Sequence, residues 1–424
     1  MNPWTGFLVF LGGLAALVLL VRLLVGARPL TVRPGTLLWW PLWIAVAVPV
    51  WLAAVLLRTV EQAWELLRSP RIRCPHPDCF QPVRTVGRAC PGCALVHRPL
   101  YPELFEPLWQ RCTCGRPVPT TALLGRNRLD AYCPHCVRRL PREVTTVRAV
   151  HIAFVGGTAS GKTMLMAAMV AGLRSWGVQW GLRIRPATPV DENRLLALQQ
   201  QLAPGGSVPA TTGAQPRAVM LLLERGRQRR LLYLYDPMGA ALEDAAAVRE
   251  QRYLAHVDGV VLVADVLADP GVRAALDRSD ASRAVAARPA LQGPVQTYEQ
   301  LTGELAGLSG GRQRVAVAVV VTKRDMLEQL ASLPVPGGPT REWLAGVGLD
   351  GLVRGIGHDF GTARYWTVSA RAAGGTAPAG ARAGPSEPEQ RHAAGPLLWL
   401  LSRSGLDTRD MTNQQNAYWA KGTL

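Results

Sequence analysis

Residues 147–163, VRAVHIAFVGGTASGKT, join an apolar run to a glycine-rich loop that ends in Lys162 and Thr163. The segment MLMAAMVAGLRSW, which has the composition of a helix, follows directly. The loop matches the pattern GxxxxGK[ST], and a strand before it and a helix after it are the context in which this pattern binds phosphate. The sequence therefore predicts an α/β fold around a phosphate-binding loop. Its residues are Gly156, Gly157, Thr158, Ala159, Ser160, Gly161, Lys162 and Thr163.

The residue types of this loop suit a nucleoside triphosphate. Glycines let successive backbone N–H groups point at the phosphates, Lys162 should reach the β- and γ-phosphates, and Thr163 should ligate Mg²⁺. Only three of the 47 basic residues of the chain are lysines, namely Lys162, Lys323 and Lys421. A lysine that persists against such a bias indicates a position where the chemistry requires it.

A second motif follows an expected β-hairpin. Residues 218–224 and 230–235 have strand patterns and flank the polar turn 225–229. The second strand ends in Asp236-Pro237-Met238-Gly239, a DxxG element. An aspartate at the carboxyl end of a buried strand is placed to hold the Mg²⁺ shell, and Gly239 can offer its N–H to a γ-phosphate.

A third motif indicates which base is bound. Two further strands are expected at residues 259–264 and 314–321, and the latter runs into Thr322-Lys323-Arg324-Asp325. Asp325 can accept hydrogen bonds from the guanine N1–H and amine, which adenine does not offer, while the Lys323 stem packs along the ring. A last strand, 363–368, leads to Ser369 and Ala370, where a backbone N–H can meet the guanine oxygen.

The order GxxxxGKT, DxxG, TKxD and SA resembles the Ras-like, translation-factor-related (TRAFAC) class of GTPases over roughly residues 147–406. The resemblance implies a domain that is built on a mostly parallel sheet and binds GTP or GDP together with Mg²⁺. It also implies a switch threonine before the second strand, for which we expect Thr212 in preference to Thr211. The expected magnesium ligands are Thr163, Thr212 and Asp236, and the expected catalytic set adds Lys162 and Gly239.

One departure from this class concerns catalysis. Members that hydrolyse GTP quickly often carry a glutamine directly after DxxG to orient water, whereas this chain has Ala240 followed by Ala241. We therefore expect slow hydrolysis, or hydrolysis that needs a residue from a partner.

All eight cysteines lie between residues 74 and 136 in four close pairs, a spacing that suits two four-cysteine zinc sites with Zn–S distances of about 2.3 Å. We expect the two zinc ribbons to form from pairs adjacent in sequence. A disulfide framework would need an oxidising compartment, which a phosphate-loop domain rarely occupies. His76, His97 or His135 could also replace a cysteine. The first expected site is Cys74, Cys79, Cys90 and Cys93, and the second is Cys112, Cys114, Cys133 and Cys136.

Residues 3–21 and 35–57 contain no charged side chain, and each is long enough to cross a bilayer, which takes about 20 residues. A signal peptide is disfavoured for the first, because Arg22 comes after the apolar run, not before it, and no A-x-A-type site follows that run. We predict a two-pass membrane protein, with a shallow re-entrant hairpin as the alternative. Arginines flank both segments, so charge does not set the orientation. The need for GTP and reduced thiols places the later domains in the cytoplasm.

These features give four parts: a membrane hairpin at 1–60, tandem zinc ribbons at 70–143, a GTPase domain at 147–406 and a tail at 407–424. The GTPase domain exceeds a minimal Ras-like fold by inserts, which we interpret as spacers in preference to partner-binding surfaces. Residues 395–405 resemble the closing helix. The inserts are 186–216, 270–313 and the low-complexity stretch 370–395.

The whole architecture resembles membrane-anchored, zinc-ribbon GTPase proteins of bacteria that are predicted to act in GTPase-centred conflict or defence systems. This resemblance implies a GTP-hydrolysing switch with a protein effector or activating partner. A scaffold that binds nucleotide without appreciable turnover is one alternative. A nucleic-acid sensor is another, disfavoured because no aromatic platform accompanies the ribbon arginines. The net charge of +17 comes from arginine and suits an anionic membrane surface.

Overall fold

The computed structural model describes scattered residues of 48–63, most of 74–145, and 147–202, 217–236, 254–309, 313–370 and 387–413 apart from single positions. The predicted span 3–21 lies outside the described residues, and only a few residues of 35–57 are described. Within the described part of the chain, none of the helices has both the length and the apolar character needed to cross a membrane. Glu61–Tyr101 and Leu108–Leu424 form one compact unit.

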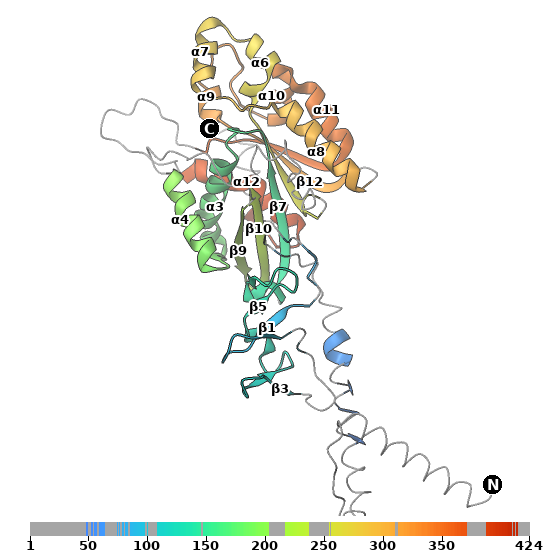
Figure 1. Cartoon of the computed structure of the whole chain (residues 1–424). Coiled ribbons are helices and arrows are strands. Elements are labelled where there is room, and N and C mark those ends of the chain that lie inside the picture. The colour runs from blue at the N-terminus through green and yellow to red at the C-terminus, as the bar shows by residue number, and fades with distance from the viewer. Residues whose placement is uncertain are drawn as a thin grey trace, which may run out of the picture. The chain divides into compact units, whose positions relative to one another are not determined.

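A seven-stranded sheet forms the centre of this unit (Figure 1). The strand order is β13-β12-β11-β7-β10-β9-β8, and β9 alone runs antiparallel to its neighbours. The predicted α/β fold with a mostly parallel sheet is therefore confirmed. The strands are β7 Arg148–Val155, β8 Leu182–Pro186, β9 Arg217–Arg225, β10 Gln228–Asp236, β11 Gly259–Ala264, β12 Gln313–Val321 and β13 Phe360–Thr367.

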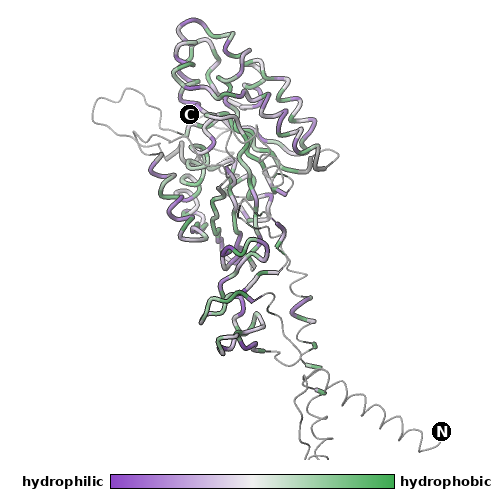
Figure 2. Tube along the Cα trace, in the orientation of Figure 1, coloured by the Kyte–Doolittle hydropathy of each residue, from purple (hydrophilic) through white to green (hydrophobic). Residues whose placement is uncertain are grey.

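The apolar runs of the sequence become strands because both faces of the sheet are covered. Every residue of β11 is buried, as expected for a central parallel strand whose side chains alternate between two layers of helices. Along β11, Val260 and Leu262 face one hydrophobic cluster while Val261 and Val263 face the other. In Figure 2 the strands of the sheet are mostly green, the colour of hydrophobic residues.

Helices cover the two faces of the sheet. One layer packs against Val261 and Val263, and the other against Val260 and Leu262. The first layer consists of α3 Lys162–Gly177, α4 Pro189–Leu202 and α12 Glu387–Arg403. The second contains α8 Pro294–Ser309, α10 Thr340–Leu344 and α11 Asp350–Asp359. Short helical segments connect these elements: η4 Val178–Trp180, η5 Val266–Ala268, α6 Pro270–Ala274, α7 Arg278–Ala286, α9 Arg324–Leu327 and the π-helix η6 Ala345–Leu349.

The predicted hairpin is confirmed, with β9 and β10 joined by the two-residue turn Gly226 and Arg227. Gly226 has φ of 55°, a left-handed conformation that glycine adopts without strain. The sequence reading missed β8, an additional edge strand that pairs with β9.

Two of the predicted inserts are folded and are not spacers. Residues 270–309 contain α6, α7 and α8, and much of 186–202 lies in α4. The closing helix begins at Glu387, within the stretch expected to be low-complexity, and continues through Pro396. Residues 203–216 and 371–386 lie outside the described part.

The cysteine-bearing region consists of short strands in the same compact unit. A buried ion pair ties Glu61 to this region: its Oε2 lies 3.0 Å from Nη2 of Arg126, and Nη1 of Arg126 donates to the carbonyls of Leu100 and Thr120. Each charge is therefore well hydrogen-bonded, as a buried pair requires.

The strands of the cysteine-bearing region form one sheet and one hairpin. The sheet has the order β2-β1-β5-β6, formed by Val96–His97, Gly87–Ala89, Ala131–Tyr132 and Arg139–Leu140. The hairpin joins β3 Trp109–Arg111 and β4 Pro117–Pro119, and the short helices η2 Arg126–Arg128 and η3 Arg142–Thr145 complete the region.

Candidate nucleotide site and cysteine clusters

The glycine-rich loop connects the end of β7 to the start of α3, at the carboxyl edge of the sheet where α/β folds bind their ligands. Gly161 precedes the helix with φ of 88°. Gly156 is needed for a different reason: a Cβ there would lie 2.9 Å from Cβ of Val263 on β11. The loop thus packs closely against the neighbouring strand.

Lys162 is the first residue of α3, and its ammonium group folds over the loop. Its Nζ donates to the carbonyls of Gly156 at 2.7 Å and Gly157 at 2.8 Å. Burial lowers the pKa of Lys162, and the nearby Asp236 opposes that shift. A buried ammonium held by two neutral carbonyls would gain from an anionic partner, which is what the phosphates of a nucleotide provide.

Two of the predicted magnesium ligands meet beside this loop. Oγ1 of Thr163 donates to Oδ2 of Asp236 at 2.6 Å, which joins the start of α3 to the end of β10. Burial raises the pKa of Asp236, whereas Thr163 and Lys162 lower it. A hydroxyl and a carboxylate are oxygen ligands of the kind that Mg²⁺ prefers, so the residues present fit this ion. The predicted Thr212 and Gly239, and also Ala240, lie outside the described residues.

The predicted base-binding residues lie at the ends of β12 and β13. Oγ of Ser369 donates to Oδ1 of Asp325 at 2.9 Å, so the TKxD and SA elements meet. Oγ1 of Thr322 donates to the carbonyl of Ser160 at 2.9 Å. Thr322 therefore connects the base-binding end directly to the phosphate loop. Ala370 follows Ser369 and is partly buried.

Lys323 has a partner that the sequence analysis missed. Its backbone is left-handed, with φ of 59°, and its Nζ lies 2.6 Å from Oδ2 of Asp265. Asp265 is almost fully buried and also accepts from the N–H groups of Leu267 and Ala290. This pair fixes the lysine stem along which a base is expected to lie. The sequence does contain a signal for Asp265 as a site residue. Asp265 directly follows the apolar run of β11, just as Asp236 stands at the end of β10.

A segment from the predicted insert also contacts the loop. Residues 288–293, called the strap below, lead from α7 into α8. The N–H of Leu291 donates to the carbonyl of Thr158 at 3.0 Å. Nothing local in the sequence indicates this contact.

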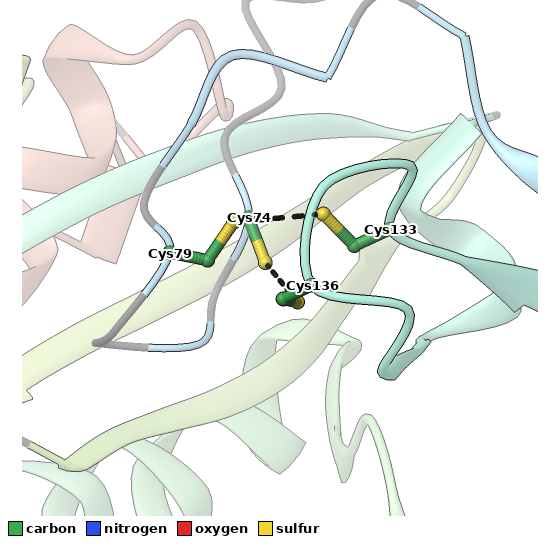
Figure 3. Close-up of side chains that lie close together, drawn as sticks. All are labelled: Cys74, Cys79, Cys133 and Cys136. Atoms are coloured by element: carbon green, nitrogen blue, oxygen red, sulfur yellow. Dashed lines mark hydrogen bonds between the residues drawn. The ribbon is translucent and has the colours of Figure 1, made fainter.

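The eight cysteines form two groups of four in which all ligand atoms lie within 4.8 Å of one another. The expected assignment of neighbouring pairs to one site is wrong, because the grouping is nested. Strand β1 pairs with the distant β5, which brings the outermost pairs together and leaves the inner ones to each other. The outer group, drawn in Figure 3, is Cys74, Cys79, Cys133 and Cys136, and the inner group is Cys90, Cys93, Cys112 and Cys114.

The sulfur spacing fits a tetrahedral metal. In the outer group, Sγ of Cys74 lies 3.6 Å from that of Cys136, and Sγ of Cys79 lies 3.7 Å from that of Cys133. The corresponding inner distances are 3.6 and 3.4 Å. A tetrahedron with Zn–S bonds of about 2.3 Å has edges of about 3.8 Å, whereas a disulfide is about 2.05 Å long. The cysteines are free thiols that could hold zinc.

Histidine does not take the place of a cysteine in either group. Nδ1 of His76 lies 3.2 Å from Sγ of Cys74, but the group already contains four sulfurs. Backbone N–H groups point at the cysteine sulfurs from the tight turns, as from Gly92 to Cys90 and from His135 to Cys133, both at 3.4 Å. These donors stabilise thiolates, the form that binds metal.

The two groups differ in their surroundings. Cys74 and Cys133 belong to the same hydrophobic cluster as Leu231 and Tyr233 of β10. The pKa of Tyr233 is raised by full burial and then by the charge of Cys74. The inner group instead packs in a small separate cluster with Leu100 and Val118. The outer group is therefore part of the core that supports the nucleotide site.

The fold and the paired contacts at the phosphate and base ends of the site define a P-loop GTPase domain. The chain belongs to the Double-GTPase 2 family, whose model matches residues 150–365. The match includes the phosphate loop, Asp236 and the TKxD element. Membership of this family implies that the domain binds GTP or GDP together with Mg²⁺. No curated protein matches the chain.

Proposed function

We propose that this protein is a membrane-anchored guanine-nucleotide switch that binds GTP with Mg²⁺ and hydrolyses it slowly or with help from a partner. The observation that carries the proposal is the pairing of residues at the two ends of the nucleotide site. Thr163 contacts Asp236 at the phosphate end, and Ser369 contacts Asp325 at the base end. Thr322 joins the two ends through Ser160.

Guanine selectivity follows from the acceptor oxygens that Asp325 presents to the donors of the base. Its Oδ1 is held by Ser369, which orients the carboxylate for the N1–H and amine of guanine. Adenine has no N1–H and carries its amine at a different position, so it would leave the partly buried carboxylate without these donors.

The switch itself would involve Thr212 and Gly239. Thr212 precedes β9 in the sequence, and Gly239 follows Asp236 at the end of β10. Contacts from these residues to Mg²⁺ and the γ-phosphate would order both segments, and hydrolysis would release them. The single antiparallel strand β9, hairpinned onto the aspartate-bearing β10, supports the resemblance to the TRAFAC class.

The finer parts of the proposal rest on the remaining sequence. Two zinc ions would occupy the two cysteine groups. The apolar segments 3–21 and 35–57 would anchor the chain in lipid with its domains in the cytoplasm, where an effector or activating partner would act. The combination of these parts supports a role in a bacterial conflict or defence system.

Ala240 favours a second candidate, a scaffold that binds nucleotide without turnover. Single-turnover release of phosphate separates the two. A rate above the spontaneous one that is lost in Lys162→Ala supports the switch, and its absence supports the scaffold. A ribbon-based nucleic-acid sensor is less favoured, and it would require salt-dependent binding of RNA or DNA.

The Asp325→Asn variant is expected to change the base preference of the site from guanine to xanthine. The amide of asparagine can accept from N1–H and donate to the C2 oxygen of xanthine, whereas it meets the guanine amine with a second donor. Loss of the charged hydrogen bond to the guanine amine, together with two donors left facing each other, costs about 3 kcal/mol or more, so GTP affinity should fall at least about 100-fold. Titration with fluorescent GTP and competition by xanthosine triphosphate measure the exchange.

Asp350→Asn is the matched control, because Asp350 lies at the start of α11 and is exposed. It should retain the wild-type preference. Unchanged GTP affinity in Asp325→Asn, with no gain for xanthosine triphosphate, would show that Asp325 does not read the base.

A further inference from the structure

Three hydrogen bonds fix the backbone of the strap against the nucleotide site. The N–H of Ala290 donates to Oδ2 of Asp265 at 2.7 Å, and that of Leu291 to the carbonyl of Thr158 at 3.0 Å. At the start of the strap, Nζ of Lys323 donates to the carbonyl of Arg288 at 2.7 Å. The strap therefore runs from the base-binding lysine to the phosphate loop.

Gln292 is the strap residue that lies directly on the loop, at Gly157. A Cβ added to Gly157 would lie 2.7 Å from the carbonyl oxygen of Gln292 and 3.1 Å from its Cβ. Gly157 is not among the glycines with left-handed backbone, so the missing side chain serves this close approach and not the conformation of the loop.

The contact lies at the γ-phosphate end of the site. Nζ of Lys162, which reaches the β- and γ-phosphates of a bound nucleotide, lies 2.8 Å from the carbonyl of the same Gly157. Arg288, by contrast, lies beside Lys323 at the base end. Gln292 is half-buried, and its side-chain amide has no hydrogen-bond partner among the described residues. A glutamine whose backbone is fixed on the phosphate loop, and whose amide has no partner in the described part of the chain, thus lies next to Gly157.

We propose that Gln292 orients the water that attacks the γ-phosphate, in place of the glutamine that Ala240 and Ala241 do not supply. The inference rests on the proposed hydrolysis of GTP. The water oxygen bonds to the γ-phosphorus while the bond from that phosphorus to the bridging oxygen breaks, and the bridging electron pair leaves with GDP. One water proton passes to the released phosphate and the other stays on the attacking oxygen. The neutral amide of Gln292 positions the water and takes no proton.

The test compares Gln292→Ala and the similarly sized Gln292→Met with wild type in the full chain. Loss of an orienting group should lower single-turnover GTP hydrolysis by about 10- to 100-fold. The affinity for GTP should stay within about twofold, because ground-state binding does not use this group. Affinity for GDP with aluminium fluoride, which mimics the transition state, should fall with the hydrolysis rate.

Leu291→Ala is the matched control on the strap, since the Leu291 side chain is 81% exposed and only its backbone contacts the loop. It should leave all three quantities unchanged. Wild-type hydrolysis rates in both Gln292 variants would overturn the role of Gln292 but not the proposed hydrolysis of GTP. An equal loss of GTP affinity and hydrolysis rate would do the same, because it indicates a structural role for Gln292. A wild-type chain that binds GTP without turnover would overturn the proposed hydrolysis, and the role of Gln292 with it.

Discussion

Lys162→Met is expected to weaken GTP binding by about 100- to 1,000-fold, the largest effect of any single substitution in the site. The variant loses a cation that would contact two phosphates, at about 1.5–3 kcal/mol for each charged hydrogen bond. The nucleotide-free fold should be affected little. Lys162 is buried and its pKa is lowered by that burial, so an apolar side chain of similar length removes a desolvation cost along with two hydrogen bonds to carbonyls.

Isothermal titration with GTP and thermal unfolding without nucleotide measure the two effects separately. Arg174→Met is the matched control, because Arg174 lies in the last turn of the same helix, α3, and the variant loses the same charge. It should bind GTP as wild type does. A Lys162→Met chain that keeps its GTP affinity would refute the assignment of the phosphate loop.

Loss of the outer cysteine group is expected to destabilise the nucleotide domain as well as the ribbons. Metal binding to a structural four-cysteine site is worth about 10–16 kcal/mol in small zinc domains, comparable with the whole stability of a domain. Cys74 and Cys133 share a hydrophobic cluster with Tyr233, which lies three residues before Asp236 on β10. Cys133→Ser should therefore lower the unfolding midpoint by more than about 10 °C and weaken GTP binding.

Cys93→Ser provides the comparison, because the inner group packs with Leu100 and Val118 away from the sheet. It should remove one of two zinc ions, measured by elemental analysis, and leave GTP affinity unchanged. Equal effects of both variants on GTP affinity would contradict the nested grouping or the coupling of the outer group to β10.

The central strands could be predicted because their signals are local. The apolar run of β11 was expected at residues 259–264 and lies at Gly259–Ala264. The hairpin turn was visible as polar residues between two apolar runs, and the phosphate loop as a complete motif between strand and helix. Burial on both faces of a parallel sheet produces such runs, so they can be read without any tertiary information.

The remaining features depend on contacts between residues far apart in the chain. The grouping of the cysteines follows from pairing of β1 with β5, and no spacing rule indicates it. The strap reaches Thr158 from Leu291, and Lys323 reaches Asp265, across long stretches of sequence. The start of α12 was placed too late, because residues 387–394 belong to a stretch of low-complexity composition and lie in the helix all the same.

The most direct test of the account is equilibrium binding of GTP and ATP to the full chain, side by side, with Mg²⁺ present. Asp325, held by Ser369 and joined to the phosphate loop through Thr322, predicts that GTP binds at least about 100-fold more tightly than ATP. Equal affinity for the two nucleotides would contradict the guanine site and, with it, the assignment of this chain as a GTP-dependent switch.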